Sequence, residues 1–272
     1  MNPGPGDQAY VERVWRTYME TGNYEEERRK RRLFQFMPGY PRCKFCQAPL
    51  GGWGSTVARV VYGKRPSALN PRLCNACEEF ARCHPGGAEI ELTLLFVDVR
   101  GSTTLAEQMR PRAYRDLINR FYTTASRILI GTDALIDKLV GDQVTGLYVP
   151  GIAGPDHARR AVEAARQIMQ ATGHTGNGRP WISLGAGVHT GVAFIGSVGT
   201  EGATNNITVL GDAANTAARL SSLARAGEIL ISKATCAQAG LRAETLEERH
   251  LELKGKRQAI SVHVLNGHGV LA

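Results

Sequence analysis

The sequence predicts an α+β fold, a ferredoxin-like α/β sandwich preceded by a helical arm and a small loop-rich metal-binding module. From Ala88 onward, apolar strand-like segments alternate with amphipathic helices, and an apparent hairpin follows the first helical region. Residues 38–87 are rich in Pro, Gly and Cys and show little periodicity. The 272 residues therefore divide into an arm over 1–37, a cysteine module and linker over 38–87, and the larger domain over 88–272.

The arm, residues 10–36, is expected to be helical. Its first half is apolar and aromatic, whereas its second half carries "EEERRKRR". Glu25 with Arg29 and Glu26 with Lys30 are favourable pairs four residues apart, so a solvated helix is the simplest interpretation of this charge run. The segment "HPGG", residues 84–87, is interpreted as a linker.

The larger domain is expected to begin with an apolar strand at 90–99 that ends near an Asp, followed by a helix at 114–129. Residues 134–149 predict two strands joined by a Gly-Asp turn, and 156–170 a second helix. Residues 181–199 predict a strand pair broken by glycines. A turn and helix follow in "ITVLGDAANTAARL", with Asp212 as the expected N-cap. A strand at 228–232, a helix near 232–239 and strands at 250–254 and 260–265 complete the domain.

Composition excludes several classes of protein. Hydrophobic residues make up 43% and charged residues 21%, which is an ordinary globular balance. No apolar run approaches the ~20 residues of a membrane span, and the N-terminus lacks a secretory signal pattern, so we expect a cytoplasmic protein. The net charge is +8, and most of the excess lies in residues 1–90. This excess fits nucleic acid, an acidic membrane or simple solubility. No reading helix or aromatic platform stands out, so a nucleic-acid partner is not expected.

Two Cys-x-x-Cys pairs, Cys43 with Cys46 and Cys74 with Cys77, are separated by 27 residues. Two such pairs in a short loop-rich segment are typical of a structural four-thiolate zinc site, which replaces a core that so few residues can hardly build. An iron–sulfur cluster stays open, because Cys83 and His84 lie close enough in sequence to add ligands. Disulfides conflict with a cytoplasmic location.

Two carboxylates of the larger domain are expected to converge. Asp98 ends the first strand and Asp142 lies in the turn of the hairpin. If the strand lies beside the hairpin, these oxygens suit Mg²⁺ that bridges substrate phosphates. The turn after Asp98 reads "VRGSTT", and the free backbone N–H groups of Gly101, Ser102 and Thr103 could hold phosphate oxygens.

The segments "LLFVDVRGSTTLAE", "KLVGDQV" and "TVLGDAANTAARL" resemble the three signature segments of class III nucleotide cyclases. The resemblance covers residues 90–266 and excludes the cysteine module. It implies that Asp98 and Asp142 bind two Mg²⁺ or Mn²⁺ ions, with the carbonyl of Val99 as a further ligand.

The same resemblance implies roles for five other residues. Lys138 and Thr208 would recognise the base, and Asn215 would orient the ribose. Arg219 would stabilise the charge that develops on the α-phosphate, and Lys254 would contact the distal phosphates. The guanidinium of Arg219 suits this role because its fork of donors matches phosphoryl oxygens and stays charged.

A homodimer is expected as well. Lys138 and Asp142 are only four residues apart across a strand and a turn, so one chain can hardly aim both at a single nucleotide. Members of the resembled family place two equivalent sites at a head-to-tail dimer interface. Because this chain carries both halves, the resemblance implies a homodimer that is inactive as a monomer. An upstream regulator is a further expected partner, and the sequence does not identify it.

The expected reaction is the conversion of ATP to 3′,5′-cyclic AMP and pyrophosphate. Many family members that use ATP carry Asp where this chain has Thr208, but a hydroxyl can also accept from the adenine amino group. Family members that use GTP tend to have an acidic residue where Lys138 stands, which favours ATP. A guanylyl or mixed-specificity cyclase and a catalytically silent nucleotide-binding module remain the alternatives. The silent module is disfavoured because Asp98, Asp142, Asn215 and Arg219 are all present.

Overall fold

The computed structural model describes residues 8–22, 33–34, 36–68, 72–84, 86–175, 179–198, 206–252 and 259–266. The chain forms two compact units. Unit 1 comprises Met1–Ile90, Val149–Gly154 and Ala193–Leu210, and unit 2 comprises Glu91–Tyr148, Pro155–Val192 and Gly211–Ala272. Two long strands, β1 (Gly86–Val99) and β4 (Leu184–Val198), contribute residues to both units.

A mixed sheet forms the centre of unit 2. Besides β1 and β4 it contains β2 (Leu135–Val140), β3 (Gln143–Tyr148), β6 (Glu228–Ser232), β7 (Glu247–Leu251) and β8 (Ile260–Asn266). The strand order is β2-β3-β1-β4-β6-β8-β7. The hairpin strand β3 is antiparallel to β1, whereas β4 and β6 are parallel. The hairpin therefore lies beside the first strand, and the predicted α+β sandwich is confirmed.

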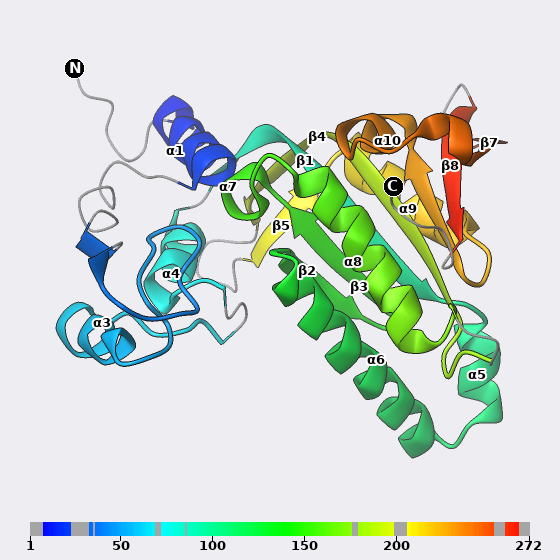
Figure 1. Cartoon of the computed structure of the whole chain (residues 1–272), viewed down its shortest axis with the longest axis horizontal. Coiled ribbons are helices and arrows are strands. Elements are labelled where there is room, and N and C mark those ends of the chain that lie inside the picture. The colour runs from blue at the N-terminus through cyan, green and yellow to red at the C-terminus, as the bar shows by residue number, and fades with distance from the viewer. Residues whose placement is uncertain are drawn as a thin grey trace. The chain divides into compact units, whose positions relative to one another are not determined.

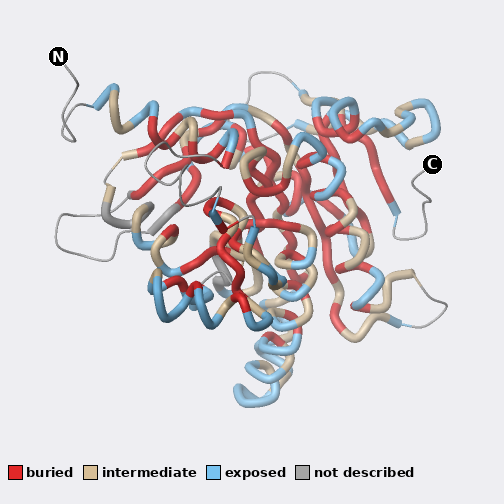
Figure 2. The backbone as a smooth tube through the Cα atoms, turned by 60° about the vertical axis from the view of Figure 1, so that its left-hand side comes forward, coloured by how far each residue is buried: buried red, intermediate tan, exposed pale blue. Residues whose placement is uncertain are grey.

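Helices α6 (Pro111–Gly131) and α8 (His157–Thr172) lie side by side along this sheet (Figure 1). α6 packs on β2 and β3, and α8 packs on β3 and β6, as the apolar face of each amphipathic helix requires. The short helix α5 (Ser102–Gln108) precedes α6 and contacts it, and α10 (Lys233–Gln238) contacts α8, β6 and β8. A 3-10 turn spans Ala243–Thr245. Buried residues follow the strands and the inner helix faces (Figure 2).

Helix α9 (Asp212–Leu223) lies close to the sheet because its contact face is built from small residues. A Cβ at Gly187 of β4 would collide with Ser221 N and Ala217 O, so glycine is required there. Leu220 and Ala224 join Leu230, Val262 and Val264 in a buried cluster beneath the helix. The small residues of α9 thus form a close-packing face against the sheet.

Unit 1 contains α1 (Gln8–Thr21), α3 (Gly54–Tyr62), α4 (Asn75–Cys83), α7 (Pro150–Ala153) and β5 (Asn206–Leu210), which pairs with the second half of β4. α1 packs against α7 through a close backbone approach. A Cβ at Gly151 would lie 2.6 Å from Met19 O and 2.7 Å from Tyr18 O. α4 packs against β5, so the cysteine-bearing helix and the strand that carries Thr208 belong to one unit.

Three local expectations need correction. The first helix ends at Thr21, well before residue 36, because Gly22 takes a left-handed conformation with φ +62°. The charged run at 25–32 lies outside the described residues. β4 is one continuous strand rather than a broken pair, because its glycines stay extended and admit neighbouring backbone. Gly211 is the N-cap of α9, and Asp212 is its first helical residue.

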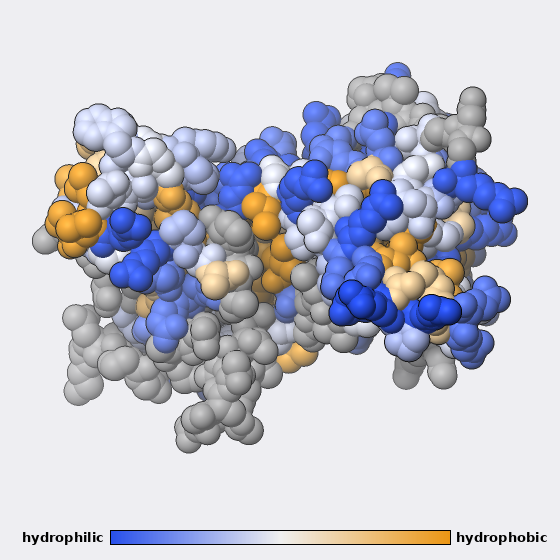
Figure 3. Space-filling model, turned by 90° about the horizontal axis from the view of Figure 1, so that it is seen from below, coloured by the Kyte–Doolittle hydropathy of each residue, from blue (hydrophilic) through white to orange (hydrophobic). Residues whose placement is uncertain are grey.

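Unit 1 exposes apolar side chains on α3. Trp53, Val57, Val60 and Val61 are 42–78% exposed, and their spacing places them along one side of the helix. Hydrophobic atoms gather over this helix at the left edge of Figure 3. Within the described part of the chain, no helix combines the length and the hydrophobicity that crossing a membrane requires.

Candidate active site

Asp98 and Asp142 meet at one edge of the sheet in unit 2. Asp98 lies opposite Gln143 in the β1–β3 ladder, and the N–H of Val99 donates to Asp142 O at 3.1 Å. Gly141 forms the turn with φ +64°, and the hydroxyl of Tyr122 on α6 donates to Gly141 O at 2.9 Å. Register and turn together hold Asp98 on β1 beside Asp142 in the adjacent β2–β3 turn, as the sequence predicted.

The electrostatics of this edge favour a bound cation. Burial raises the pKa of the Asp98 carboxyl, and the neighbouring charge of Asp142 raises that pKa further, while Arg100 opposes both effects. Two carboxylates in a half-buried position repel each other unless positive charge is supplied. Hard oxygen ligands of this kind fit Mg²⁺ or Mn²⁺.

Arg100 is the functional candidate that the sequence analysis did not single out. Its guanidinium forms an ion pair with Asp98 and donates to Ser222 O at 2.8 Å and Ala224 O at 3.4 Å. The signal was present in the sequence, because residues two apart on a strand share one face, and Arg100 directly extends β1. The backbone N–H of Arg100 also donates to Ser183 O at 2.8 Å.

Helix α9 presents Asn215 and Arg219 four residues apart, away from its buried face. Asn215 is exposed and Arg219 is half-buried, so both can reach a ligand from solvent. The N–H of Asn215 donates to Gly211 O at 3.2 Å, which closes the first turn of the helix. The amide of Asn215 and the guanidinium of Arg219 therefore share one face of the helix.

The remaining predicted residues are distributed as follows. Gly101, with φ +68°, Ser102 and Thr103 form the turn from β1 into α5 in unit 2. Thr208 belongs to unit 1, where it is buried on β5 opposite Gly196. Lys138 pairs through its backbone with Thr145 on β3, and its side chain lies outside the described residues, as does Lys254.

A pocket of about 460 Å³ lies beside the β1–α5 turn. Arg100, Gly101 and Leu105 line one part of it, and Leu117 and Trp181 line another. The guanidinium of Arg120 lies 4.1 Å from the centre of the Trp181 ring, a cation–π contact. Neither Asp98 nor Asp142 lines the pocket, but Arg100, which pairs with Asp98, does, so the pocket lies next to the carboxylate edge.

In unit 1 the four cysteines converge as predicted. The Sγ atoms of Cys43, Cys46, Cys74 and Cys77 all lie within 4.8 Å of one another, and all four residues are buried. Cys74 is the N-cap of α4 and Cys77 lies in its first turn. Backbone N–H groups of Cys74 and Cys77 donate to Cys43 Sγ at 3.3 Å and to Cys74 Sγ at 3.4 Å. The site could hold zinc, since its four ligands suit a tetrahedral ion.

The thiol chemistry agrees with this fit. Hydrogen bonds from Cys43, Cys46 and Cys77 lower the pKa of Cys74, and the nearby Lys64 acts in the same direction. Hydrogen bonds with the other three cysteines of the cluster raise the pKa of Cys77. Burial raises the pKa of Cys43, but hydrogen bonds with Cys46 and Cys77 lower it overall. Thiolates this close together repel one another until a cation compensates their charge. Among the described side chains His84 does not join the cluster, because its Nδ1 lies 2.7 Å from Phe80 O.

Helix α1 covers this cluster through aromatic contacts within unit 1. The Tyr18 ring stacks on Phe45 with centroids 3.7 Å apart, and its hydroxyl donates to Cys77 O at 3.1 Å. Trp15 Nε1 donates to His84 O at 3.3 Å. The arm and the cysteine module are thus packed together, and Trp15 is only 1% exposed.

The family model described as the adenylate and guanylate cyclase catalytic domain matches residues 88–267. This chain belongs to the class III adenylyl and guanylyl cyclase family, as the three sequence segments predicted. The matched range includes Asp98, Asp142, Asn215 and Arg219.

Curated relatives include an adenylate cyclase of Anabaena cylindrica, 30% identical over 188 residues that cover 63% of this chain and 36% of that protein. Adenylate cyclase 1 of Rhizobium meliloti is 25% identical over 184 residues, covering 65% of this chain and 28% of the relative. The chain therefore spans about a third of the length of these relatives.

Two solved structures are similar to the chain. The guanylyl cyclase Cya2 has a TM-score of 0.60 at 26% identity and covers 66% of this chain and 93% of its own. The adenylyl cyclase CyaB from P. aeruginosa has a TM-score of 0.58 at 26% identity and covers 66% and 96%. The fold is therefore shared with cyclases of both base specificities.

Proposed function

We propose that this protein is an adenylyl cyclase that converts ATP to 3′,5′-cyclic AMP and pyrophosphate. The observation that carries the proposal is the convergence of Asp98 on β1 with Asp142 in the adjacent β2–β3 turn. Lys138 and the adenylate cyclases among the relatives favour adenine. The reaction needs positioning and charge stabilisation more than covalent help from the protein.

Two divalent ions would be held by Asp98, Asp142 and the carbonyl of Val99. When bound, they would supply activation of the ribose 3′-hydroxyl and neutralisation of the triphosphate. The backbone N–H groups of Gly101, Ser102 and Thr103 would contact phosphate oxygens, as free amides at such turns do.

The other side chains would position the nucleotide. Asn215 would orient the ribose, and Arg219 would stabilise the negative charge that develops on the α-phosphate during attack. Lys254 would contact the distal phosphates, and Lys138 and Thr208 would recognise the base. Asn215 and Arg219 are suited to one ligand because they share a face of α9.

A head-to-tail homodimer would assemble two equivalent sites. The carboxylates of one chain would then act with five residues of the other, so a monomer would be inactive. These residues are Lys138, Thr208, Asn215, Arg219 and Lys254. The short sequence separation of Lys138 and Asp142 supports this division. Only the end of one strand and a turn separate them, so one chain can hardly aim both side chains at the same nucleotide.

We further propose that Cys43, Cys46, Cys74 and Cys77 hold one structural zinc ion. The close approach of the four sulfurs and the repulsion among their thiolates support this assignment. An unidentified upstream regulator would act on the N-terminal region, and the exposed apolar side of α3 offers a surface for it.

The proposal is tested by incubating the protein with ATP or GTP and Mg²⁺ or Mn²⁺ and separating cyclic products by chromatography. We expect cyclic AMP from ATP, and product below about 1% of wild type from Asp98→Ala, because removal of a charge-stabilising group typically costs about 10²–10³-fold. Cyclisation of neither nucleotide above the Asp98→Ala level would overturn the enzymatic function.

A mixed-specificity cyclase is the second candidate, and the observation that favours it is Thr208. A hydroxyl both donates and accepts, so it can pair with the adenine amino group or with the guanine carbonyl. Comparable cyclic product from ATP and GTP at equal concentration would establish this alternative.

Thr208→Asp is expected to raise the ratio of kcat/KM for ATP to kcat/KM for GTP by about tenfold. A carboxylate accepts strongly from the adenine amino group and repels the guanine carbonyl, and hydrogen bonds to charged groups contribute about 1.5–3 kcal/mol. The measurement is steady-state kinetics with both nucleotides.

Thr208→Val is the matched control for this prediction, since it preserves shape at a buried position without the hydroxyl. Its kcat/KM for ATP should fall, with little gain in the ratio. An unchanged ratio in Thr208→Asp would remove Thr208 from base recognition.

A further inference from the structure

We propose that Arg100 is a positioning residue of the cyclase reaction with two separable effects. Its guanidinium holds the C-terminal end of α9 at the end of β1, and its charge competes with divalent cations for Asp98. This inference rests on the proposed function, because it concerns the same carboxylate site.

The bridging role follows from the donors of one side chain. Nη2 of Arg100 pairs with Asp98, while Nη1 donates to Ser222 O at 2.8 Å and Ala224 O at 3.4 Å. The acceptors are carbonyls in and after the last turn of α9, where free carbonyls and the helix dipole favour a cation. A planar guanidinium can donate to the Asp98 carboxylate and to the α9 carbonyls at the same time, which a lysine ammonium cannot do equally well.

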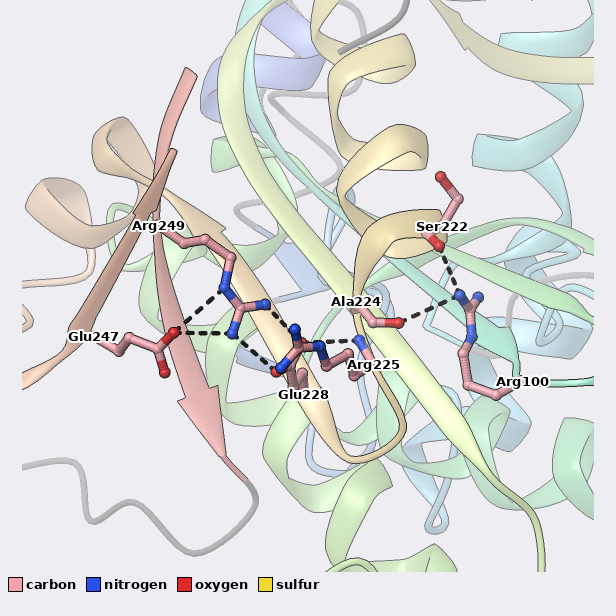
Figure 4. A network of polar contacts seen from close by, with 7 residues as sticks. All are labelled: Arg100, Ser222, Ala224, Arg225, Glu228, Glu247 and Arg249. Atoms are coloured by element: carbon pink, nitrogen blue, oxygen red, sulfur yellow. Dashed lines mark hydrogen bonds and ion pairs between the residues drawn. The ribbon is translucent and has the colours of Figure 1, made fainter. Parts of the chain in front are cut away.

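The bridge reaches the catalytic candidate on the same helix. Ser222 Oγ donates to Arg219 O at 2.9 Å, so the turn that Arg100 holds is the turn that begins at Arg219. Figure 4 shows Arg100 directed at the carbonyls of Ser222 and Ala224. The position of Arg219 relative to β1 of its own chain therefore depends on this guanidinium. In the proposed dimer, this Arg219 acts at the site that holds the carboxylates of the other chain.

A second clamp holds the following loop without touching the carboxylate site. Arg249 on β7 pairs with Glu228 and Glu247, and Glu228 accepts from the N–H of Arg225 at 2.9 Å (Figure 4). This clamp fixes the α9–β6 connection from its other side. It provides a matched comparison, because it stabilises the same connection and, among the described residues, the ion pairs of Arg249 are with Glu228 and Glu247 rather than with Asp98.

The competitive role follows from charge. The side chains of Arg100 and Asp98 are each about 20% exposed, so their interaction is only partly screened by solvent. A divalent ion bound to Asp98 is repelled by a guanidinium that pairs with the same carboxylate. Removal of the positive charge should therefore tighten metal binding while it loosens the position of α9.

The test measures Mn²⁺ affinity and cyclase kinetics separately in the full chain. For Arg100→Gln we expect about tenfold tighter binding of Mn²⁺ alone by calorimetry, together with a kcat lowered by about tenfold or more through misplacement of Arg219. Arg100→Lys keeps the charge without the fork, so it should keep wild-type Mn²⁺ affinity within about twofold and still lose kcat.

Two control variants show whether the effects of Arg100→Gln are specific to Arg100. Arg249→Gln should lower the melting temperature and leave Mn²⁺ affinity unchanged, and Asp98→Asn should weaken Mn²⁺ binding. Unchanged or weaker Mn²⁺ binding in Arg100→Gln, or wild-type kcat in Arg100→Lys, would overturn the inference. Failure of the proposed function is distinct, because wild-type protein would then cyclise neither nucleotide.

Discussion

Mixing Asp98→Ala chains with Arg219→Ala chains should restore cyclase activity that neither variant has alone. Each single variant is expected to lose about 10²–10³-fold in rate. In a head-to-tail dimer, one site of the heterodimer receives the intact carboxylates of one chain and the intact guanidinium of the other. An equal mixture should therefore regain about a quarter of wild-type activity, because half of the dimers are mixed and each has one complete site.

The matched control for this prediction is a mixture of Asp98→Ala with Asp142→Ala. These residues lie on the same half of the site, since the turn that holds Asp142 is beside the end of β1, so every site in the heterodimer lacks one carboxylate. No rescue is expected from this second mixture. If the first mixture also stays inactive while both variants remain folded and dimeric, sites shared between chains are ruled out.

Cys74→Ser should abolish stable zinc binding and release α1 from the cysteine module. Cys74 contacts the other sulfurs and caps α4, so the substitution removes a zinc ligand while the serine hydroxyl can still cap the helix. Structural zinc sites contribute about 10–16 kcal/mol of binding free energy. We expect zinc content to fall from one ion per chain to near zero, measured by atomic emission on purified protein.

The same variant should change the tryptophan fluorescence, because Trp15 is buried against this module. Cyclase activity should fall as well, since α4 packs on β5, which carries Thr208. Cys236→Ser is the control, as Cys236 is a buried cysteine of unit 2 outside the cluster. Undiminished zinc content in Cys74→Ser would exclude the four-thiolate site.

Much of the cyclase domain could be predicted because its periodicity is strong and its motifs are local. The apolar run that ends near Asp98 and the Gly-Asp turn at Asp142 predicted two strands whose ends converge, and the register confirms it. The ends of the helices and strands were harder to predict. A glycine in a strand can break it or admit a neighbour, and the contact of Gly187 with α9 is visible only after folding.

Arg100 and Tyr122 illustrate what local patterns leave out. Both act on the carboxylate edge through partners distant in sequence, Ser222 for Arg100 and Gly141 for Tyr122. Neither forms a spaced motif of the kind that the Cys-x-x-Cys pairs make. Their roles depend on which elements the sheet order and helix packing bring together.

The sequence by itself determined the cyclase family, the α+β fold and the four cysteines that converge, because each is encoded by residue type at short spacing. Only the tertiary structure decided that Arg100 joins Asp98 to the end of α9, and that α1 covers the cysteine cluster through Tyr18. The physical reason is that these contacts are long-range. They are set by strand register and close packing, which one segment of sequence cannot specify alone.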